Sequence, residues 1–358
     1  MFTWLSKQIK PGIGKKVFVG VSGGVDSSVA LALLQDQGYD VVGVFIRTWQ
    51  PDFIECTWRD ERRDAMRVCA HLGVPFVELD LEHEYKEGVA DYMIAEYKKG
   101  RTPNPDVMCN REVKFGGFLT WALAQGADYV ATGHYAQNNN GELVKGIDQS
   151  KDQSYFLWTL TPEQLKHILF PVGNLPKTKV RKLARKYRLP TAVKKDSQGV
   201  CFIGEIDMKE FLKHYIGSDT GLVTNEHGEV VGQHEGVLLY TLGERHGFTI
   251  TKKTTSDKPY YVIAKDIKNN KLVVSQNPQS TVIDSQVHLE QCVWRVHPNS
   301  KQYTVQIRYH GALKEVHMSH VTNTNALVHF TESDFSLAPG QSVVIFDGAV
   351  CIGGGIVA

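Results

Sequence analysis

The first third of the chain alternates short apolar runs with longer stretches in which apolar residues recur at helical spacing. Residues 16–21, 41–46, 76–79 and 129–133 are the apolar runs, and each has the length of a buried strand. Helical spacing follows in residues 59–72, 85–99 and 112–125. Alternating strands and helices form a parallel sheet that binds ligands at the carboxyl ends of its strands. The pattern therefore predicts a doubly wound α/β domain.

The pattern of apolar and turn-forming residues changes after residue 217. Residues 161–216 look mainly helical, but after them the chain breaks into short strand-like runs separated by turns such as His227-Gly228 and Asn269-Asn270. The runs are residues 229–231, 237–240, 260–264, 271–275, 303–309, 326–330 and 343–346. Asp347-Gly348 is a strong hairpin signal. We expect an α/β domain with a helical extension over residues 1–216, then two small β-rich modules over 217–280 and 281–358.

The junction between the first strand and the first helix carries the most informative residues, Ser-Gly-Gly-Val-Asp-Ser-Ser at 22–28. Glycines before a helix N-terminus let an anion approach backbone N–H groups, and the helix dipole favours its negative charge. The Walker pattern is absent, because Lys16 stands where Ser or Thr would follow Gly14-Lys15. The loop predicts a phosphate cradle. An ordinary strand–turn–helix junction is the alternative.

Two other polar segments contain cysteines. In residues 102–111, prolines at alternate positions favour an extended backbone, so we expect a rigid loop carrying Asp106 and Cys109. A surface loop with an incidental cysteine is the alternative. Residues 195–202 place Cys201 after polar, turn-forming residues. Cys69, by contrast, fits a buried helical face, and the chain has no CxxC pair, which argues against a zinc ribbon or thioredoxin-type site.

Composition narrows the class of protein. With 358 residues, 42% hydrophobic and 22% charged, the chain has the makeup of a globular protein of two or three domains. It has no apolar stretch near the roughly 18 residues of a membrane span and no signal-peptide core, so we expect a cytoplasmic protein without membrane contact. The net charge of +1 excludes a polycation. Residues 177–188 nevertheless gather Lys and Arg without acids, which fits either nucleic-acid contact or a solvated helix face.

Six segments together resemble the tRNA-specific 2-thiouridylases (the MnmA family) of the PP-loop ATP pyrophosphatase superfamily. They are SGGVDSS, GRTPNPDVMCNREVKF, ATGHYA, KDQSYFL, DSQGVCFIGE and PGQ, in matching order and spacing from about Val17 to the C-terminus. The resemblance implies a Rossmann-like PP-loop domain, a small central domain and an RNA-contacting C-terminal β-barrel. It also implies an enzyme that adenylates the C2 oxygen of the tRNA wobble uridine (U34) with ATP and replaces that oxygen with sulfur, releasing AMP and pyrophosphate.

The resemblance further implies the residues that bind ATP and transfer sulfur. Those expected to bind ATP, with Mg²⁺ offsetting the phosphate charge, are Gly20, Val21, Ser22, Gly23, Gly24, Val25, Asp26, Ser27, Ile46 and Gly133. Asp26 as a helix cap is an alternative. Cys201 would accept a persulfide from a sulfur-donor protein, a cysteine desulfurase or a sulfur-relay protein. Cys109 would then release hydrogen sulfide from that persulfide or resolve it after direct attack, leaving a Cys109–Cys201 disulfide. Asp106 would act as general acid or base, or simply cap a turn.

The resemblance implies RNA contacts as well, at Asn104, Pro105, Asp106, His134, Lys151, Asp152, Gln153, Arg308, Tyr309 and Gln341. A purely structural role for His134 remains open. So do two other functions, a PP-loop synthetase that forms amides and a non-catalytic RNA-binding protein. The cysteine pair argues against the first, and the intact loop at 22–28 against the second. The chain departs from the family at residues 45–49 and at Glu244, where Gln is usual.

Overall fold

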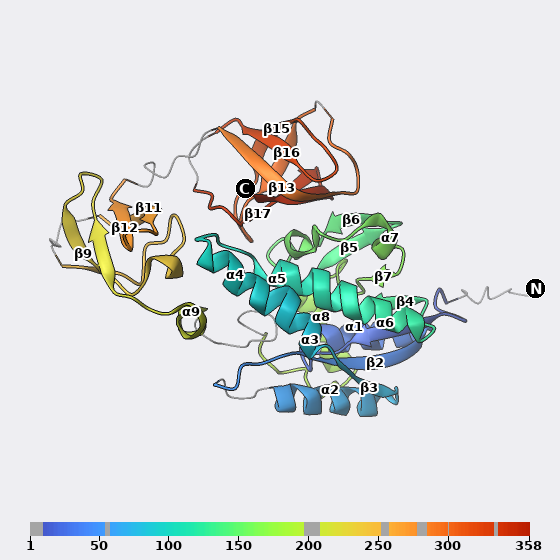
Figure 1. The fold of residues 1–358 in the computed structure, drawn as a ribbon. Coiled ribbons are helices and arrows are strands. Elements are labelled where there is room, and N and C mark those ends of the chain that lie inside the picture. The colour runs from blue at the N-terminus through green and yellow to red at the C-terminus, as the bar shows by residue number, and fades with distance from the viewer. Residues whose placement is uncertain are drawn as a thin grey trace, which may run out of the picture. The chain divides into compact units, whose positions relative to one another are not determined.

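The computed structural model describes residues 10–53, 58–196, 208–251, 258–277, 285–299, 301–332 and 336–358. The chain forms two compact units (Figure 1). The first comprises Met1–Lys86 and Cys109–Gly204, and the second comprises Glu87–Met108 and Glu205–Ala358. The segment carrying α4 therefore belongs with the β-rich half of the chain, although it precedes that half by about a hundred residues in the sequence.

A parallel sheet of order β3-β2-β1-β4-β7 lies at the centre of the first unit. Its strands are β1 (Lys16–Gly20), β2 (Asp40–Arg47), β3 (Phe76–Asp80), β4 (Tyr129–Ala131) and β7 (Ile168–Leu169). Along β1, Val17 and Val19 pack on one face with Leu31 of α1 (Val25–Asp36). On the other face, the ring of Phe18 lies 5.3 Å from that of Trp121 in α6 (Phe118–Ala124). Helices on both faces confirm the predicted doubly wound architecture.

The other elements of the first unit pack around this sheet. They are α2 (Trp58–Leu72), α3 (Glu82–Tyr85), the π-helix η2 (Cys109–Gly117), β5 (Ala136–Asn139), β6 (Glu142–Lys145), the 3-10 helix η3 (Ser154–Leu157), α7 (Pro162–Leu165) and α8 (Lys177–Lys186). A second π-helix, η1 (Lys86–Asp91), begins where the chain leaves this unit. The expectation that residues 161–216 are mainly helical is wrong for much of 166–196, where Pro171, Pro176 and Pro190 interrupt helical hydrogen bonding.

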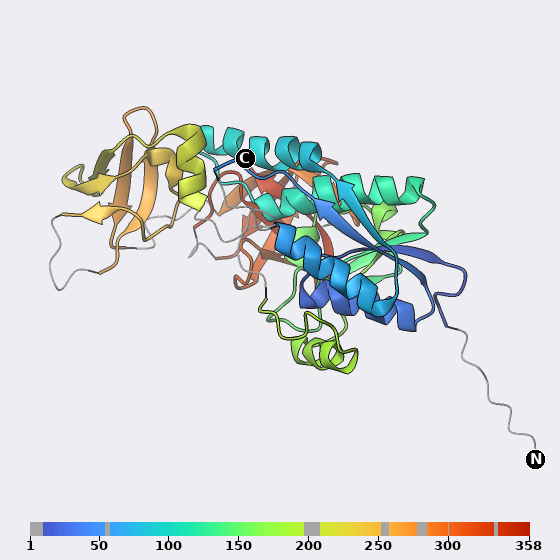
Figure 2. The ribbon, with the colours of Figure 1, turned by 90° about the horizontal axis from the view of Figure 1, so that it is seen from below.

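The second unit contains a sheet of order β10-β9-β8-β12-β11. Its strands are drawn in yellow and orange in Figure 2. Its strands are β8 (Gly221–Thr224), β9 (Val230–His234), β10 (Thr249–Ile250), β11 (Tyr261–Asp266) and β12 (Lys271–Ser275), with α4 (Tyr92–Lys98), α5 (Pro105–Met108) and α9 (Met208–Ile216) in the same unit. The strand predicted at residues 237–240 is wrong. Val237–Leu239 is a 3-10 helix, η4, because the Leu239 N–H turns back to donate to the Gly236 carbonyl at 3.1 Å.

The C-terminal strands form a closed antiparallel barrel of order β13-β16-β15-β14-β17-β18, which the pairing of β13 with β18 completes. The strands are β13 (Gln286–Trp294), β14 (Tyr303–Gln306), β15 (Lys314–Ser319), β16 (Ala326–Phe330), β17 (Ser342–Asp347) and β18 (Val350–Val357). Alternate residues such as Val305, Val328 and Ile345 fill its core. This arrangement confirms the predicted β-barrel. In the part of the chain that the structure describes, no helix is both long and apolar enough to cross a membrane.

Candidate active site

The order of the parallel sheet reverses between β1 and β4, and ligands of such sheets bind at this switch point. Residues 21–28, which we call the glycine loop, follow β1, and Gly133 follows β4. The two segments touch. A Cβ atom added to Gly133 would lie 2.5 Å from the Ser27 backbone nitrogen and 2.8 Å from the Asp26 carbonyl carbon. The fold therefore brings together two segments expected to bind ATP, and only glycine fits at residue 133.

The glycine loop has the local geometry of an anion site. Gly23 has a φ of +69°, and a Cβ there would lie 2.5 Å from the Glu61 carbonyl oxygen, so this position also requires glycine. Helix α1 begins after Gly24, which has no side chain to accept hydrogen bonds from the first-turn N–H groups. The Ser27 hydroxyl accepts a hydrogen bond from the Ser22 N–H at 3.3 Å. Backbone donors, two hydroxyls and a helix dipole therefore converge here.

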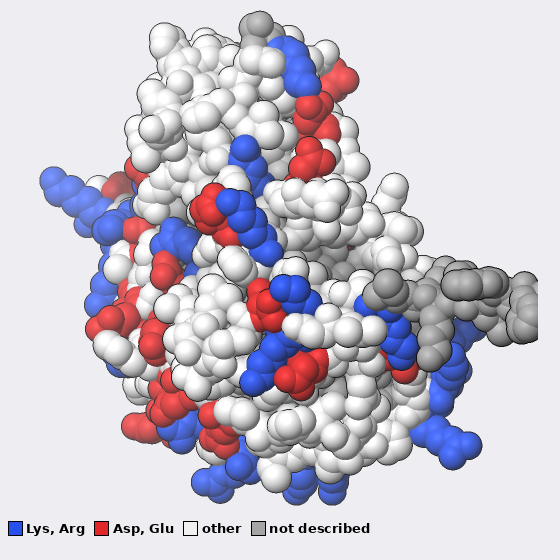
Figure 3. All heavy atoms as spheres, turned by 90° about the vertical axis from the view of Figure 1, so that its right-hand side faces the viewer, with Lys and Arg blue, Asp and Glu red and all other residues white. Residues whose placement is uncertain are grey.

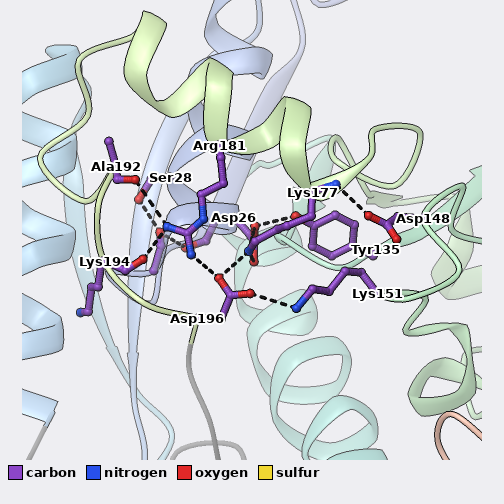
Figure 4. Close-up of polar contacts among 12 residues, drawn as sticks. Asp26, Ser28, Tyr135, Asp148, Lys151, Lys177, Arg181, Ala192, Lys194 and Asp196 are labelled. Atoms are coloured by element: carbon purple, nitrogen blue, oxygen red, sulfur yellow. Dashed lines mark hydrogen bonds and ion pairs between the residues drawn. The ribbon is translucent and has the colours of Figure 1, made fainter.

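Asp26 turns away from the helix start toward Tyr135 and Lys177 (Figure 4). The Tyr135 hydroxyl donates to Asp26 Oδ1 at 2.7 Å, and Lys177 Nζ lies 2.7 and 2.8 Å from the two carboxylate oxygens. Burial and the Asp26 charge raise the pKa of Tyr135, which keeps its hydroxyl a donor. Asp26 thus does not cap α1, because the cap position is Gly24 and carries no side-chain bond. Its carboxylate belongs to a charged network.

Lys177 and Tyr135 belong to this network but were not predicted as site residues. Lys177 lies within the basic run at 177–188, but its side chain is only 13% exposed and contacts Asp26 and Asp196. A signal was present in the sequence. Lys177 and Arg181 are four residues apart and share a helix face with the buried residues Val180 and Ala184. That spacing places both cations beside the core of the unit.

Asp196 binds three cations from two different segments. Its carboxylate lies 2.8 Å from Lys177 Nζ and 3.0 Å from Lys151 Nζ, and it also accepts a hydrogen bond from the Arg181 guanidinium (Figure 4). Burial raises the pKa of Asp196, but hydrogen bonds from Lys177 and Lys151 outweigh burial and lower this pKa to about 2. The carboxylate is therefore ionised at neutral pH, within the DSQGVC segment that also contains Cys201.

The segment around Asp106 and Cys109 differs from the expected loop. Pro105–Met108 forms α5, and η2 continues it from Cys109. The prediction was wrong because a proline at the first helical position loses no hydrogen bond. Asn104 completes this helix start, since its Oδ1 accepts from the N–H groups of Asp106 at 3.1 Å and Val107 at 3.2 Å. The capping residue is thus Asn104 rather than Asp106.

Cys109 is buried at the first position of the π-helix η2. Such helices are rare and often occur at functional sites. The neighbouring Asn110 is buried too, and its Nδ2 donates to the Phe156 carbonyl at 3.1 Å. Cys201 lies outside the described residues. Its proximity to Cys109 therefore remains a prediction.

The proposed RNA-contacting residues of the first unit have partners within it. His134 is buried beside Phe115 and Phe170, with Nδ1 2.7 Å from the Thr132 hydroxyl, and burial lowers the pKa of His134 well below its usual value. The imidazole is therefore neutral. Gln153 Oε1 accepts from the Tyr135 N–H at 3.0 Å. Asp152 accepts from the Gly146 and Ser154 N–H groups at 2.9 and 3.1 Å. The RNA roles of these residues remain predictions.

The three barrel residues lie near the surface of the second unit. Arg308 and Tyr309 are exposed, and Arg308 Nη2 donates to the Ser336 carbonyl at 3.1 Å. The Tyr309 ring lies 3.9 Å from the ring of His310. Gln341 Oε1 accepts from the Ala338 N–H at 3.0 Å. A guanidinium next to an exposed aromatic residue suits a phosphate and a base, and an RNA role for this pair stays a prediction.

Helix α8 carries a run of cations with no acidic residue among them. Its exposed cations are Lys179, Lys182, Arg185 and Lys186, followed by Arg188. The face drawn in Figure 3 instead shows Lys and Arg interspersed with Asp and Glu, in keeping with the net charge of +1. Helix α8 is therefore a candidate for backbone contacts with an anionic polymer.

The parallel sheet, the glycine loop at its switch point and the appended β modules define an α/β protein with a candidate anion-binding loop. Three family models match consecutive parts of the chain. They are the tRNA methyl transferase HUP domain over residues 15–205, the tRNA methyl transferase PRC-barrel domain over 209–276 and the Aminomethyltransferase beta-barrel domain over 284–357. No cluster of three or more His, Cys, Asp or Glu residues suited to a metal occurs among the described residues.

Full-length relatives identify the family. The chain is 44% identical to the tRNA-specific 2-thiouridylase MnmA of Enterococcus faecalis, with 96% of this chain and 95% of the relative covered. It is 45% identical to that of Thiobacillus denitrificans, with 96% and 99% covered. A solved structure, the U34-tRNA thiolase NcsA of Methanococcus maripaludis, is 18% identical over 52% of this chain and 60% of that one, with a TM-score of 0.35. The chain belongs to the tRNA-specific 2-thiouridylase family, as its motifs predicted.

Proposed function

We propose that this protein uses ATP to convert the wobble uridine of tRNA to 2-thiouridine. One observation carries the proposal, the packing of Gly133 on Asp26 and Ser27, which builds an anion cradle at the switch point of the sheet. Relatives named as tRNA-specific 2-thiouridylases, aligned over nearly the whole chain, supply the substrate class. A nucleotide cradle alone would leave the acceptor of the adenylyl group open.

The residues at the cradle fit the triphosphate of ATP. The first turn of α1 offers N–H groups without a side-chain cap, Ser22 and Ser27 offer hydroxyls, and Lys177 offers a cation. Ile46, buried at the end of β2, supplies an apolar surface for the base. Mg²⁺ bound with ATP would neutralise phosphate charge, and Asp26 is the carboxylate of the loop that would hold it.

The first chemical step solves a leaving-group problem. The C2 carbonyl oxygen of uridine attacks the α-phosphorus of ATP, the bond to the β-phosphate breaks, and pyrophosphate leaves. The oxygen is then part of an adenylate, which departs as AMP when sulfur attacks C2. Donors fixed around the phosphates stabilise the charge that develops on them.

Sulfur then arrives through the two cysteines. A sulfur-donor protein leaves a persulfide on Cys201, and its terminal sulfur attacks C2 as AMP departs. The Cys109 thiolate then attacks the Cys201 sulfur, which frees 2-thiouridine and leaves a Cys109–Cys201 disulfide. Two external thiols, or one dithiol, reduce this disulfide by exchange and are themselves oxidised to a disulfide. In the second route, Cys109 first releases hydrogen sulfide from the persulfide, and the sulfide attacks C2. Asp106 serves either route as general acid or base.

The tRNA would contact both units. In this proposal Asn104, Pro105, Asp106 and His134 lie near the target base, Lys151, Asp152 and Gln153 contact the same RNA, and Arg308, Tyr309 and Gln341 reach it from the barrel. Residues 1–216 would form the catalytic domain, 217–280 a central domain and 281–358 the RNA-contacting barrel. Exposed cations on α8 add contacts to the phosphate backbone.

The test is to incubate the purified protein with ATP, sulfide and unmodified tRNA and to measure 2-thiouridine by mass spectrometry. Pyrophosphate release that depends on tRNA should accompany its formation. An amide-forming synthetase would instead keep full turnover in Cys109→Ser and Cys201→Ser. Failure to form 2-thiouridine, while ATP and tRNA both bind, would refute the proposal.

A further inference from the structure

The ammonium group of Lys177 has no N–H left for a further acceptor. Its nitrogen lies 2.7 Å from Asp26 Oδ1, 2.8 Å from Asp26 Oδ2 and 2.8 Å from Asp196 Oδ1. An ammonium has three N–H donors, and these three oxygens occupy them. A phosphate oxygen that binds Lys177 must therefore displace a carboxylate oxygen.

Asp196 is the more easily displaced of the two partners. Lys177 contacts both oxygens of Asp26, but only Oδ1 of Asp196. Asp196 also retains Lys151 and Arg181 when Lys177 leaves it, so its charge stays compensated. A phosphate that competes for Lys177 would therefore mainly break the bond between Lys177 and Asp196.

Asp196 also stands at a particular place in the chain. It belongs to the DSQGVC segment and precedes Cys201 by five positions. On the amino-terminal side, the backbone carbonyl of Lys194 accepts a hydrogen bond from Arg181 at 2.5 Å, and Lys194 Nζ pairs with Asp64 at 2.8 Å. Among the contacts of Asp196 and Lys194 named here, only the bond from Asp196 to Lys177 leads to the glycine loop, because Lys177 also binds Asp26.

We propose that Asp196 is a positioning residue that couples nucleotide binding to the segment carrying Cys201. It does so by competing with the phosphates of ATP for Lys177. The inference rests on the proposed function in one respect, namely that ATP phosphates bind at the glycine loop. A polyphosphate anion therefore competes with the Asp196 carboxylate for one shared group, the Lys177 ammonium.

Linkage makes this coupling reciprocal. Any free energy by which ATP weakens the Lys177–Asp196 bond is free energy by which Asp196 weakens ATP binding. Asp196→Asn keeps the shape of the side chain but removes its charge. In the network of Figure 4 it leaves Asp26 as the one carboxylate paired with the Lys177 ammonium. The variant should therefore bind ATP more tightly, whereas loss of a merely structural residue would weaken binding.

The experiment measures the dissociation constant of the α,β-methylene analogue of ATP by calorimetry on the full-length protein. Asp196→Asn should lower that constant by about fivefold or more, the lower end of typical coupling. Lys194→Gln is the matched control, because it removes an ion pair of the same segment without touching Lys177. Its dissociation constant should equal that of the wild type.

A second measurement follows the coupling to Cys201 directly. In a Cys109→Ser background, the alkylation rate of the Cys201 peptide is measured by mass spectrometry with and without the analogue. The rate should change with nucleotide in the parent protein and in Lys194→Gln, but not once Asp196→Asn is added. The proposal requires a nucleotide response in the parent protein. The test therefore remains informative even if Asp196→Asn does not fold.

Three results would overturn the inference. They are unchanged or weaker nucleotide binding by folded Asp196→Asn, a nucleotide response of Cys201 that survives in that variant, and no response in the parent protein while the analogue binds. The thiolation assay separates the two proposals. Coupling without thiolation would refute only the proposed function, whereas thiolation without coupling would refute only this inference.

Discussion

Gly133 lies against Ser27 so closely that a Cβ on the glycine would sit 2.5 Å from the serine backbone nitrogen. The atom in the way is backbone and cannot rotate aside. The loop after β4 and the first turn of α1 are therefore held at a fixed spacing. In the proposed function, that spacing sets the room for a phosphate at the glycine loop.

Gly133→Ala should push these two segments apart. We expect ATP affinity to fall at least tenfold and the free energy of unfolding to fall by about 1–3 kcal/mol, as for overpacked sites. Calorimetric titration and denaturant unfolding measure the two effects. Gly20→Ala is the stability control, since its Cβ would meet its nearest atom at an ordinary 3.6 Å. Equal stability losses in the two variants would contradict the argument.

Cys201→Ala and Cys109→Ser should each abolish 2-thiouridine formation while leaving tRNA affinity within about twofold. The reason is that both thiols carry sulfur in the proposed mechanism and do not bind RNA. Mass spectrometry of the tRNA and filter binding provide the readouts. Cys69→Ala is the control, because burial raises the pKa of the Cys69 thiol to about 11 and keeps it unreactive. Normal thiolation by Cys201→Ala would refute the assignment.

Helix α8 should bind tRNA phosphates through its exposed cations. Replacing Lys182 and Arg185 with Ala should weaken tRNA binding several-fold and reduce the slope of log affinity against log salt by about one for each phosphate that is no longer neutralised. Lys177 is left out because its ammonium binds Asp26 and Asp196. Lys166→Ala, next to α7 and paired with Glu163, is the control. An unchanged slope would identify α8 as an ordinary solvated face.

His134 should make the protein less stable in acid. Burial lowers its folded-state pKa well below the usual 6.5, so below about pH 6.5 the unfolded chain binds a proton that the folded one does not. The free energy of unfolding should therefore fall by up to about 1.4 kcal/mol per pH unit from this group alone. His134→Phe should remove that slope in urea titrations between pH 6.5 and 5. Above pH 7.5 the two proteins should show parallel profiles, and parallel profiles in acid as well would contradict the expectation.

Arg101 and Lys99 offer a matched test within the second unit, because both pair with Glu96. Arg101 is 19% exposed and also pairs with Glu290 at 2.5 Å, whereas Lys99 is 65% exposed. Arg101→Met leaves two carboxylates without this partner and should cost about 3 kcal/mol of stability. Lys99→Met should cost about 0.5 kcal/mol or less. Denaturant unfolding measures both, and equal losses would contradict a structural role for the motif arginine.

Much of the architecture was readable from local pattern alone. The parallel strands showed as apolar runs because both faces of such a sheet are buried. The β-rich modules showed as short strand-like runs separated by turns. The glycine loop was readable because its backbone demands specific residues. Three local predictions failed for local reasons. Pro105 begins a helix rather than preventing one, and residues 237–239 turn back on Gly236 instead of pairing. Prolines interrupt much of the helical structure expected over residues 166–196.

The sequence by itself determined the layers, the glycine loop and the family, because these depend on periodicity and on residues that a backbone conformation requires. Only the tertiary structure decided which charged side chains pair with one another. Lys177 looked like one more cation of a basic run, yet folding places it between Asp26 and Asp196, which are 170 positions apart. Spacing along a chain reports which residues share a face of one element. That spacing does not show which side chains of a distant element will contact the face.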